Sequence, residues 1–247
     1  MKLLAVLNEY ASLFKDIADQ DYISARSNYR LRLREQFFWA GLQALEKYLK
    51  GILLFNQRSI VQYRNHDLSA VCKAVETIPW IDFCWPATLE ETLKRFRELG
   101  DNRYLSTDTY VRPHNLGELD EAVWHIRRYC QYVRVTVTAE TGTVDLTQQL
   151  VKAINAMDCK RPRRFKLSLS GGYLEKVLAS SQSDAARRAL VWNNRFFGSS
   201  RVSTATKRVW SSSQVPPNRR TWFTATVKKE VEKYIYFPRG RSDLFCF

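Results

Sequence analysis

Apolar residues recur at helical spacing through the first 140 residues, and this periodicity limits the fold more than any other feature of the sequence. Short connections separate the periodic segments, and such connections are typical of antiparallel helical bundles. The sequence therefore predicts a mainly α fold that begins with an antiparallel bundle. The expected helices cover about residues 1–20, 22–55, 66–78, 89–99 and 116–137.

Two of the expected helix ends carry local signals. Asp67 stands at the start of the third segment, where an acidic residue favours a helix N-terminus. Gly100 follows the fourth segment, as glycine often does just beyond a helix C-terminus.

A boundary between two domains is expected near residue 140, where "TAETGT" interrupts the helical pattern. Residues 1–140 would form the bundle, and residues 141–247 a basic C-terminal domain that mixes helices with irregular segments. Within the second domain, we expect helices at about residues 145–158, 172–181 and 183–197, the last of them with Ser183 as the candidate N-cap. The type of the closing element, residues 221–237, is left open.

The charge is divided unevenly between these two parts. Residues 1–140 contain 19 Lys and Arg against 18 Asp and Glu, whereas residues 141–247 contain 20 against 7. The second part also has more arginine than lysine, and arginine can both fork onto phosphate and stack on bases. Since nucleic acid is the commonest partner of so basic a surface, we expect the second part to contact it.

Arginines interleaved with aromatic residues favour single-stranded nucleic acid, RNA above all, because the charges follow the backbone while rings stack on unpaired bases. Trp192 and Phe197 are nevertheless better suited to a core than to stacking. The candidate nucleic-acid-binding residues are Lys160, Arg161, Arg163, Arg164, Lys166, Arg187, Arg188, Arg195, Arg201, Lys207, Arg208, Arg219 and Arg220.

Several classes of protein are disfavoured by what the sequence contains. The five cysteines form no C-x-x-C pair, which argues against a zinc site or a disulfide framework and suits a reducing cytoplasm. The N-terminus is not typical of a signal peptide, and no run of apolar residues is as long as a membrane span. No G-K-[ST] follows the Gly171–Gly172 turn, as a phosphate-binding loop would require. We therefore expect a cytoplasmic protein with no metal, cofactor or membrane partner.

Three short motifs, in order, resemble the HEPN family over about residues 20–137. The segment "FFWAGLQALEKYLKGILL", residues 37–54, is similar to the signature helix of that family, with Gln43, Glu46, Lys47 and Lys50 at matching positions. "HDL" at residues 66–68 and "NRY" at residues 102–104 follow in the expected places. The same helix could also be plain packing, because a Glu–Lys pair four residues apart occurs in many helices.

The resemblance implies a bundle of four or five helices, usually dimeric, of the kind found in prokaryotic antiviral defence and toxin–antitoxin systems. Catalytic members are metal-independent ribonucleases with an R-x(4–6)-H motif. A histidine can transfer the protons of the 2′-hydroxyl and the leaving oxygen, while an arginine offsets charge on the phosphate. None of the three histidines of this chain has an arginine at that spacing.

Arg103 and His114 are the nearest candidates for a catalytic pair, with ten residues between them. Their segment could be a diverged catalytic loop, a binding loop that retains only the arginine, or an ordinary polar connection. His66 fits a helix start better than catalysis, and His125 fits a packing or dimer contact.

The sequence thus favours a HEPN-like RNA-binding protein, and it leaves open whether the protein is also a metal-independent endoribonuclease. Two alternatives remain. One is a non-catalytic regulatory module that pairs with a nucleotidyltransferase or another effector. The other is a structural subunit of a nucleoprotein complex.

Overall fold

The structure is a computed structural model of the 247-residue chain. It describes residues 2–63, 66–100, 109–112, 114–139, 142–156, 171–197, 212–214, 224–231 and 233.

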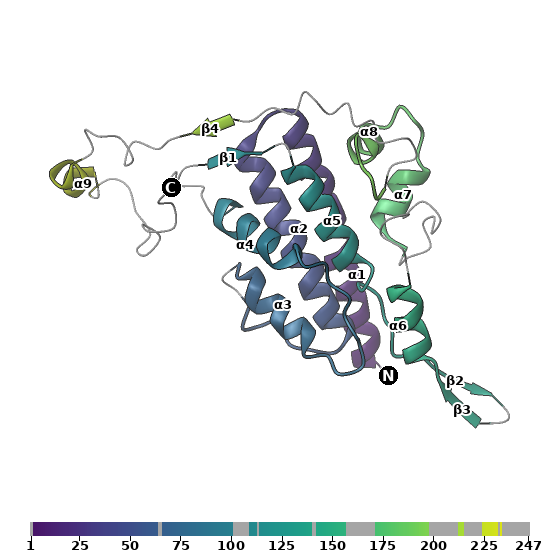
Figure 1. Ribbon diagram of the computed structural model, residues 1–247. Coiled ribbons are helices and arrows are strands. Elements are labelled where there is room, and N and C mark those ends of the chain that lie inside the picture. The colour runs from purple at the N-terminus through teal and green to yellow at the C-terminus, as the bar shows by residue number, and fades with distance from the viewer. Residues whose placement is uncertain are drawn as a thin grey trace.

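A mainly helical bundle is confirmed, and its centre is the helix that carries the longest predicted motif (Figure 1). This helix, α2, packs against every other helix of the bundle and is buried along most of its length. The bundle helices are α1 (Lys2–Arg30), α2 (Arg34–Phe55), α3 (Leu68–Glu76), α4 (Leu89–Gly100) and α5 (Asn115–Arg127).

The predicted break near residue 21 is wrong, because α1 continues to Arg30. No proline or glycine interrupts residues 2–30, and buried Tyr22 and Tyr29 continue the apolar stripe. The chain turns at residues 31–33, where Arg32 adopts a left-handed φ of 62°. Since neither glycine nor proline marks this turn, the sequence carries no ordinary signal for it.

Gly100 ends α4, but packing against α2 is what requires a glycine there. A Cβ atom at this position would lie 2.8 Å from the Cβ of Leu42 and 2.9 Å from the carbonyl oxygen of Phe38. The missing side chain lets the two helices approach closely, next to rings of Phe38 and Phe96 whose centroids are 5.3 Å apart.

The predicted helix over residues 116–137 is too long, because α5 ends at Arg127 and turns follow. Cys130 and Val133 are still buried, so the apolar spacing reflects a packed but irregular segment. An antiparallel hairpin comes next, formed by β2 (Thr136–Ala139) and β3 (Gly142–Asp145).

Three short helices of the second part pack onto the bundle and share its core: α6 (Thr147–Asn155), α7 (Tyr173–Ala179) and α8 (Ala185–Val191). The helix predicted for residues 183–197 is shorter in the structure, because α8 begins at Ala185 and ends at Val191. Its cap is Asp184 rather than Ser183, because the Asp184 carboxylate accepts from the Arg187 amide at 2.8 Å. A domain boundary at residue 140 stays a prediction.

The remaining described elements are short. Strand β1 (Thr109–Val111) pairs antiparallel with β4 (Ser212–Gln214), and α9 (Ala225–Val231) belongs to the closing element whose type was open. Among the helices that the structure describes, none combines the length and the apolar character needed to cross a membrane.

Candidate functional site

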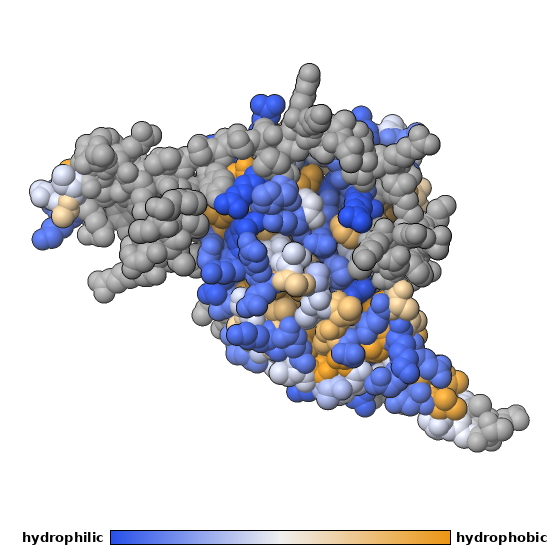
Figure 2. Space-filling view, viewed as in Figure 1, coloured by the Kyte–Doolittle hydropathy of each residue, from blue (hydrophilic) through white to orange (hydrophobic). Residues whose placement is uncertain are grey.

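Of the predicted catalytic pair, the structure describes only His114, because Arg103 lies outside the described residues. His114 directly precedes α5, and its side chain is 55% exposed. Its Nε2 atom lies 3.6 Å from the Glu118 carboxylate, which also accepts from Arg95 at 2.7 Å and from Asn115 at 2.8 Å. His114 thus belongs to a polar network around Glu118. The side of the molecule drawn in Figure 2 is largely hydrophilic around α4.

A second histidine cluster joins two of the motifs that resemble the HEPN family. The Nδ1 atom of His66, just before α3, lies 2.6 Å from a carboxylate oxygen of Glu46 in α2. The other carboxylate oxygen of Glu46 accepts from Lys50. Glu46 is buried whereas the His66 side chain is 37% exposed, so the carboxylate holds the Nδ1 edge of the imidazole. A histidine oriented in this way can exchange a proton through its other nitrogen.

His66 also has a fixed backbone and a fixed ring. Its φ of 53° is left-handed, which is uncommon for a residue other than glycine. Its ring meets the ring of Trp39 edge to face at 5.6 Å. The next residue, Asp67, caps α3 through the Ala70 amide at 3.1 Å and pairs with Arg97 at 2.8 Å. The start of α3 is therefore anchored at three points, whereas the sequence pattern indicated only Asp67.

His125 is buried inside α5, as expected for a packing residue. Burial, together with the nearby positive charge of Arg128, lowers the pKa of His125 to about 4. The imidazole is consequently neutral near pH 7, and the residue is only 4% exposed, which suits packing rather than contact with a substrate.

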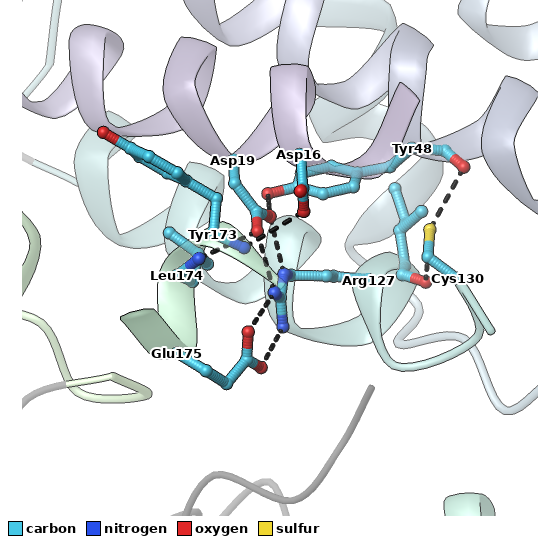
Figure 3. Close-up of polar contacts among 9 residues, drawn as sticks. Asp16, Asp19, Tyr48, Arg127, Cys130, Tyr173, Leu174 and Glu175 are labelled. Carbon is cyan, nitrogen blue, oxygen red and sulfur yellow. Dashed lines mark hydrogen bonds and ion pairs between the residues drawn. The ribbon is translucent and has the colours of Figure 1, made fainter. Parts of the chain in front are cut away.

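A buried polar network connects the second part of the chain to the bundle (Figure 3). Asp19 of α1 accepts from Arg127 at 2.7 and 2.8 Å, from Tyr48 at 2.6 Å and from the Leu174 amide at 2.9 Å. Arg127 also forms two bonds to Glu175, at 2.7 and 2.6 Å. Both carboxylates that meet Arg127 have all their oxygens partnered, so the cluster acts as a structural clamp for α7.

Gly171 and Gly172 form the turn that leads into this network, as the sequence predicted. Gly172 has a φ of 139°, and a Cβ atom there would lie 2.9 Å from a carboxylate oxygen of Asp16. The same carboxylate of Asp16 accepts from the Tyr173 amide at 3.0 Å. Glycine is therefore needed here both for its backbone freedom and for the close approach to α1.

A second buried network holds the segment around α8. Arg26 of α1 pairs with Asp120 of α5 and donates to the carbonyl oxygens of Ala189 and Trp192. Tyr22 donates to Asp120 at 2.6 Å and accepts from Asn194 at 2.8 Å. The two networks together fix residues 171–197 against α1 and α5.

Exposed arginines from both parts of the chain come together beside α8. Arg30 lies over the ring of Trp192 at 5.2 Å and reaches the carbonyl oxygen of Arg188 at 3.5 Å. We call four exposed residues the arginine-rich end: Arg30, Arg32, Arg188 and Arg195. None of the four forms an ion pair with any carboxylate that the structure describes.

The structure describes three of the thirteen predicted nucleic-acid-binding residues. Arg188 and Arg195 are exposed, whereas Arg187 is half-buried and its Nε atom donates to the carbonyl oxygen of Leu178 at 3.1 Å. Ten lie outside the described residues and stay predictions: Lys160, Arg161, Arg163, Arg164, Lys166, Arg201, Lys207, Arg208, Arg219 and Arg220.

Arg30 and Arg32 were missed because the first 140 residues are balanced in charge as a whole. The segment "YRLRLR", residues 29–34, carried the local signal. The preference for Trp192 and Phe197 as packing residues is confirmed. Trp192 packs beside Tyr29, with ring centroids 6.5 Å apart, and Phe197 packs beside Tyr22 at 5.9 Å.

A shallow pocket of about 270 Å³ lies between α3 and the start of α4. Its lining includes Cys72, Glu76 and Glu90. Burial and the two glutamates raise the pKa of the Cys72 thiol to about 12, so it is protonated and a poor nucleophile. Within the described residues, no three His, Cys, Asp or Glu side chains are grouped to hold a metal ion.

Comparison with known proteins gives no match: no protein-family model, no curated protein and no solved structure resembles this chain closely enough to be significant.

Proposed function

We propose that this chain is a HEPN-like RNA-binding protein of a prokaryotic defence or toxin–antitoxin type system. The observation that carries the proposal is the arginine-rich end, where Arg30 at the end of α1 meets Arg188 of α8. The order of the bundle helices and the contact between Glu46 and His66 support the resemblance to that family.

Four exposed guanidinium groups, two of them on residues in contact, Arg30 and Arg188, suit a polyanion. Each can fork onto a phosphate, and none is neutralised by a carboxylate among the described residues. Single-stranded RNA is the favoured ligand because the predicted basic segments interleave arginine with aromatic residues.

The binding test measures the fluorescence anisotropy of labelled single-stranded RNA across a salt series, in the presence of EDTA. The double variant Arg32→Glu/Arg188→Glu reverses two charges of the arginine-rich end. If both contact phosphate, the slope of log affinity against log salt should fall by about 1.4, since each contact contributes about 0.7 for single strands.

A matched control is Arg58→Glu/Lys73→Glu, which makes the same charge change at two other exposed residues. Arg58 follows the far end of α2, a helix about 33 Å long at 1.5 Å per residue, whereas Arg32 precedes its start. Equal losses of affinity in both double variants would contradict a specific role for the arginine-rich end, and would instead indicate a response to net charge.

For cleavage, we propose Arg103 and His114 as the pair to test, with Arg103 on the phosphate and His114 as the proton-transferring group. Arg103→Ala should abolish metal-independent RNA cleavage while leaving thermal unfolding unchanged. Cleavage that continues at the wild-type rate in this variant would exclude the pair.

The alternative is a non-catalytic module that pairs with a nucleotidyltransferase or another effector. The absence of the strict R-x(4–6)-H motif and the carboxylate next to His114 favour it. Salt-sensitive RNA binding without any cleavage would support this alternative, and so would a nucleotidyltransferase or effector gene beside this one.

A further inference from the structure

The pocket of about 270 Å³ between α3 and the start of α4 has no part in the RNA binding proposed above. We call it the α3–α4 pocket. Two of its walls come from these neighbouring helices (Figure 1). A third wall comes from the segment before α4, where the ring of Trp85 stacks on Phe83 at 4.9 Å and meets Tyr129 edge to face at 5.1 Å. These ring contacts hold Trp85 in place, so the pocket has a fixed aromatic wall.

Two carboxylates line the α3–α4 pocket from different helices. Glu76 is the last residue of α3, and Glu90 is in the first turn of α4. A carboxylate oxygen of Glu76 lies 3.9 Å from the Sγ atom of Cys72, and the charge of Glu90 acts on the same buried thiol. Neither carboxylate forms an ion pair with a lysine or arginine in the part of the chain that the structure describes. Both negative charges are therefore available to a cation that enters the pocket.

The rest of the pocket combines apolar groups with one opposing charge. Leu89 and Leu93 of α4 are buried and supply an apolar surface, together with Pro86. Exposed Lys73 also lines the pocket, so its formal charge is −1, from two carboxylates against one ammonium. An apolar surface beside unpaired carboxylates suits a ligand with a long apolar stem and a cationic end, and it disfavours phosphate.

We propose that the α3–α4 pocket binds an arginine side chain of a partner protein. A guanidinium is planar and has five N–H donors, so it can bond carboxylates from two helices at once, whereas a lysine ammonium is a compact and strongly hydrated charge. The methylene stem of the arginine would lie along Leu89 and Leu93. The size of the pocket agrees with one side chain, because pockets for drug-sized molecules typically hold about 300–1,000 Å³.

A protein is the source of this arginine because the pocket is shallow. Sites for free small molecules usually bury about 70–90% of the ligand surface, which a shallow pocket cannot do alone. An arginine on a protein surface is covered on its outer side by the partner itself. Arginine is also one of the residues that most often dominate the energy of protein interfaces.

An NMR titration of the full chain with N-acetyl-L-argininamide, which mimics arginine within a peptide, tests the proposal. Amide signals of α3 and of the start of α4 should shift, with a dissociation constant in the millimolar range. The citrulline analogue has nearly the same shape but no charge and should not bind, and the lysine analogue should bind more weakly than arginine. Absence of shifts at tens of millimolar, or equal binding of the citrulline analogue, would overturn the proposal.

Variants then assign the binding to the two carboxylates. Glu76→Gln/Glu90→Gln should weaken the binding of N-acetyl-L-argininamide at least about tenfold. The matched control is Glu91→Gln, since Glu91 is an exposed residue of α4 that does not line the pocket. Lys73→Met should strengthen binding because it removes the opposing charge. An equal loss in the Glu91→Gln variant would show a response to overall charge and would contradict the proposal.

Two further outcomes would exclude a partner protein as the source of the ligand. Free L-arginine that binds more tightly than N-acetyl-L-argininamide would show that the pocket recognises an amino acid with its own carboxylate. Single-stranded RNA that shifts the same amides, and that binds more weakly to the Glu76→Gln/Glu90→Gln variant, would make the pocket part of an RNA surface. We expect neither, and RNA affinity in this variant should equal or exceed that of the wild-type chain.

Discussion

Replacing Arg127 with methionine tests whether the buried polar network holds α7 against the bundle. The guanidinium is almost fully buried and bonds two carboxylates, Asp19 and Glu175. Methionine has a similar length but no charge, so the variant leaves Asp19 buried without the cation that forms two hydrogen bonds to it. Tyr48 and the Leu174 amide would still donate to Asp19, but they cannot balance its charge.

The expected cost follows from removing one partner of a buried ion pair. Such changes typically cost about 3–5 kcal/mol, because an uncompensated charge remains in the interior. For a chain of this size, 1 kcal/mol lowers the melting temperature by about 2–4 °C, so a loss of roughly 6–20 °C is expected. Glu175→Gln should cost less, since Glu175 lies at the partly exposed edge of the network.

Urea unfolding of the wild-type chain and the Arg127→Met variant measures the loss. Hydrogen exchange then locates it, with α7 amides expected to exchange faster than those of α2. In the double variant Asp19→Leu/Arg127→Met, the cost should be smaller than the sum of the two single changes, because neither member of the Asp19–Arg127 pair is left without the other. A loss below about 1 kcal/mol for Arg127→Met would refute this reasoning, since surface ion pairs are worth that little.

Three further predictions concern stability. The low pKa of His125 means that the unfolded chain binds more protons than the folded chain between pH 4 and 6.5, so unfolding free energy should fall as pH falls through this window. His125→Gln should remove up to about 2 kcal/mol of that fall, measured by urea unfolding at pH 7 and pH 5. Gly100→Ala should cost about 1–3 kcal/mol of stability, because the added methyl clashes with Leu42. Gly117→Ala should instead stabilise the protein by about 0.5–1 kcal/mol, because the added methyl meets nothing within 4 Å. Thermal melts of both variants separate the two effects. Glu46→Gln weakens the charge-assisted bonds to Lys50 and His66 and should cost about 1–3 kcal/mol of stability. Amides of α3 should then exchange faster with solvent. Unchanged exchange would count against the anchoring role of His66.

The helices of the bundle could be predicted from the sequence because apolar spacing depends on burial alone. Their ends were harder, since the turn at Arg32 has neither glycine nor proline, and Asp184 rather than Ser183 caps α8. The irregular stretch after Arg127 kept a helical apolar pattern because Cys130 and Val133 are buried. Periodicity reports which side chains face the core, and it does not report whether the backbone between them is helical.

Charge counts, like apolar periodicity, predict only part of the candidate site. A count of charges separates a neutral part from a basic part, but it cannot say which arginines meet solvent. Arg26 and Arg127 belong to the neutral part and are buried, where each balances a carboxylate and fixes residues 171–197 in place.

This fixing in turn determines which charges are available to a ligand. By holding α8 beside the end of α1, the Arg26 network brings Arg188 next to Arg30, and these two residues are 158 positions apart in the chain. A variant that loosens this network should therefore weaken RNA binding without touching an exposed arginine. Arg26→Met, measured by the same anisotropy assay at constant salt, should lower RNA affinity together with stability. If the α8 amides of this variant exchange faster with solvent but its RNA affinity is unchanged, RNA binding does not depend on holding Arg188 next to Arg30.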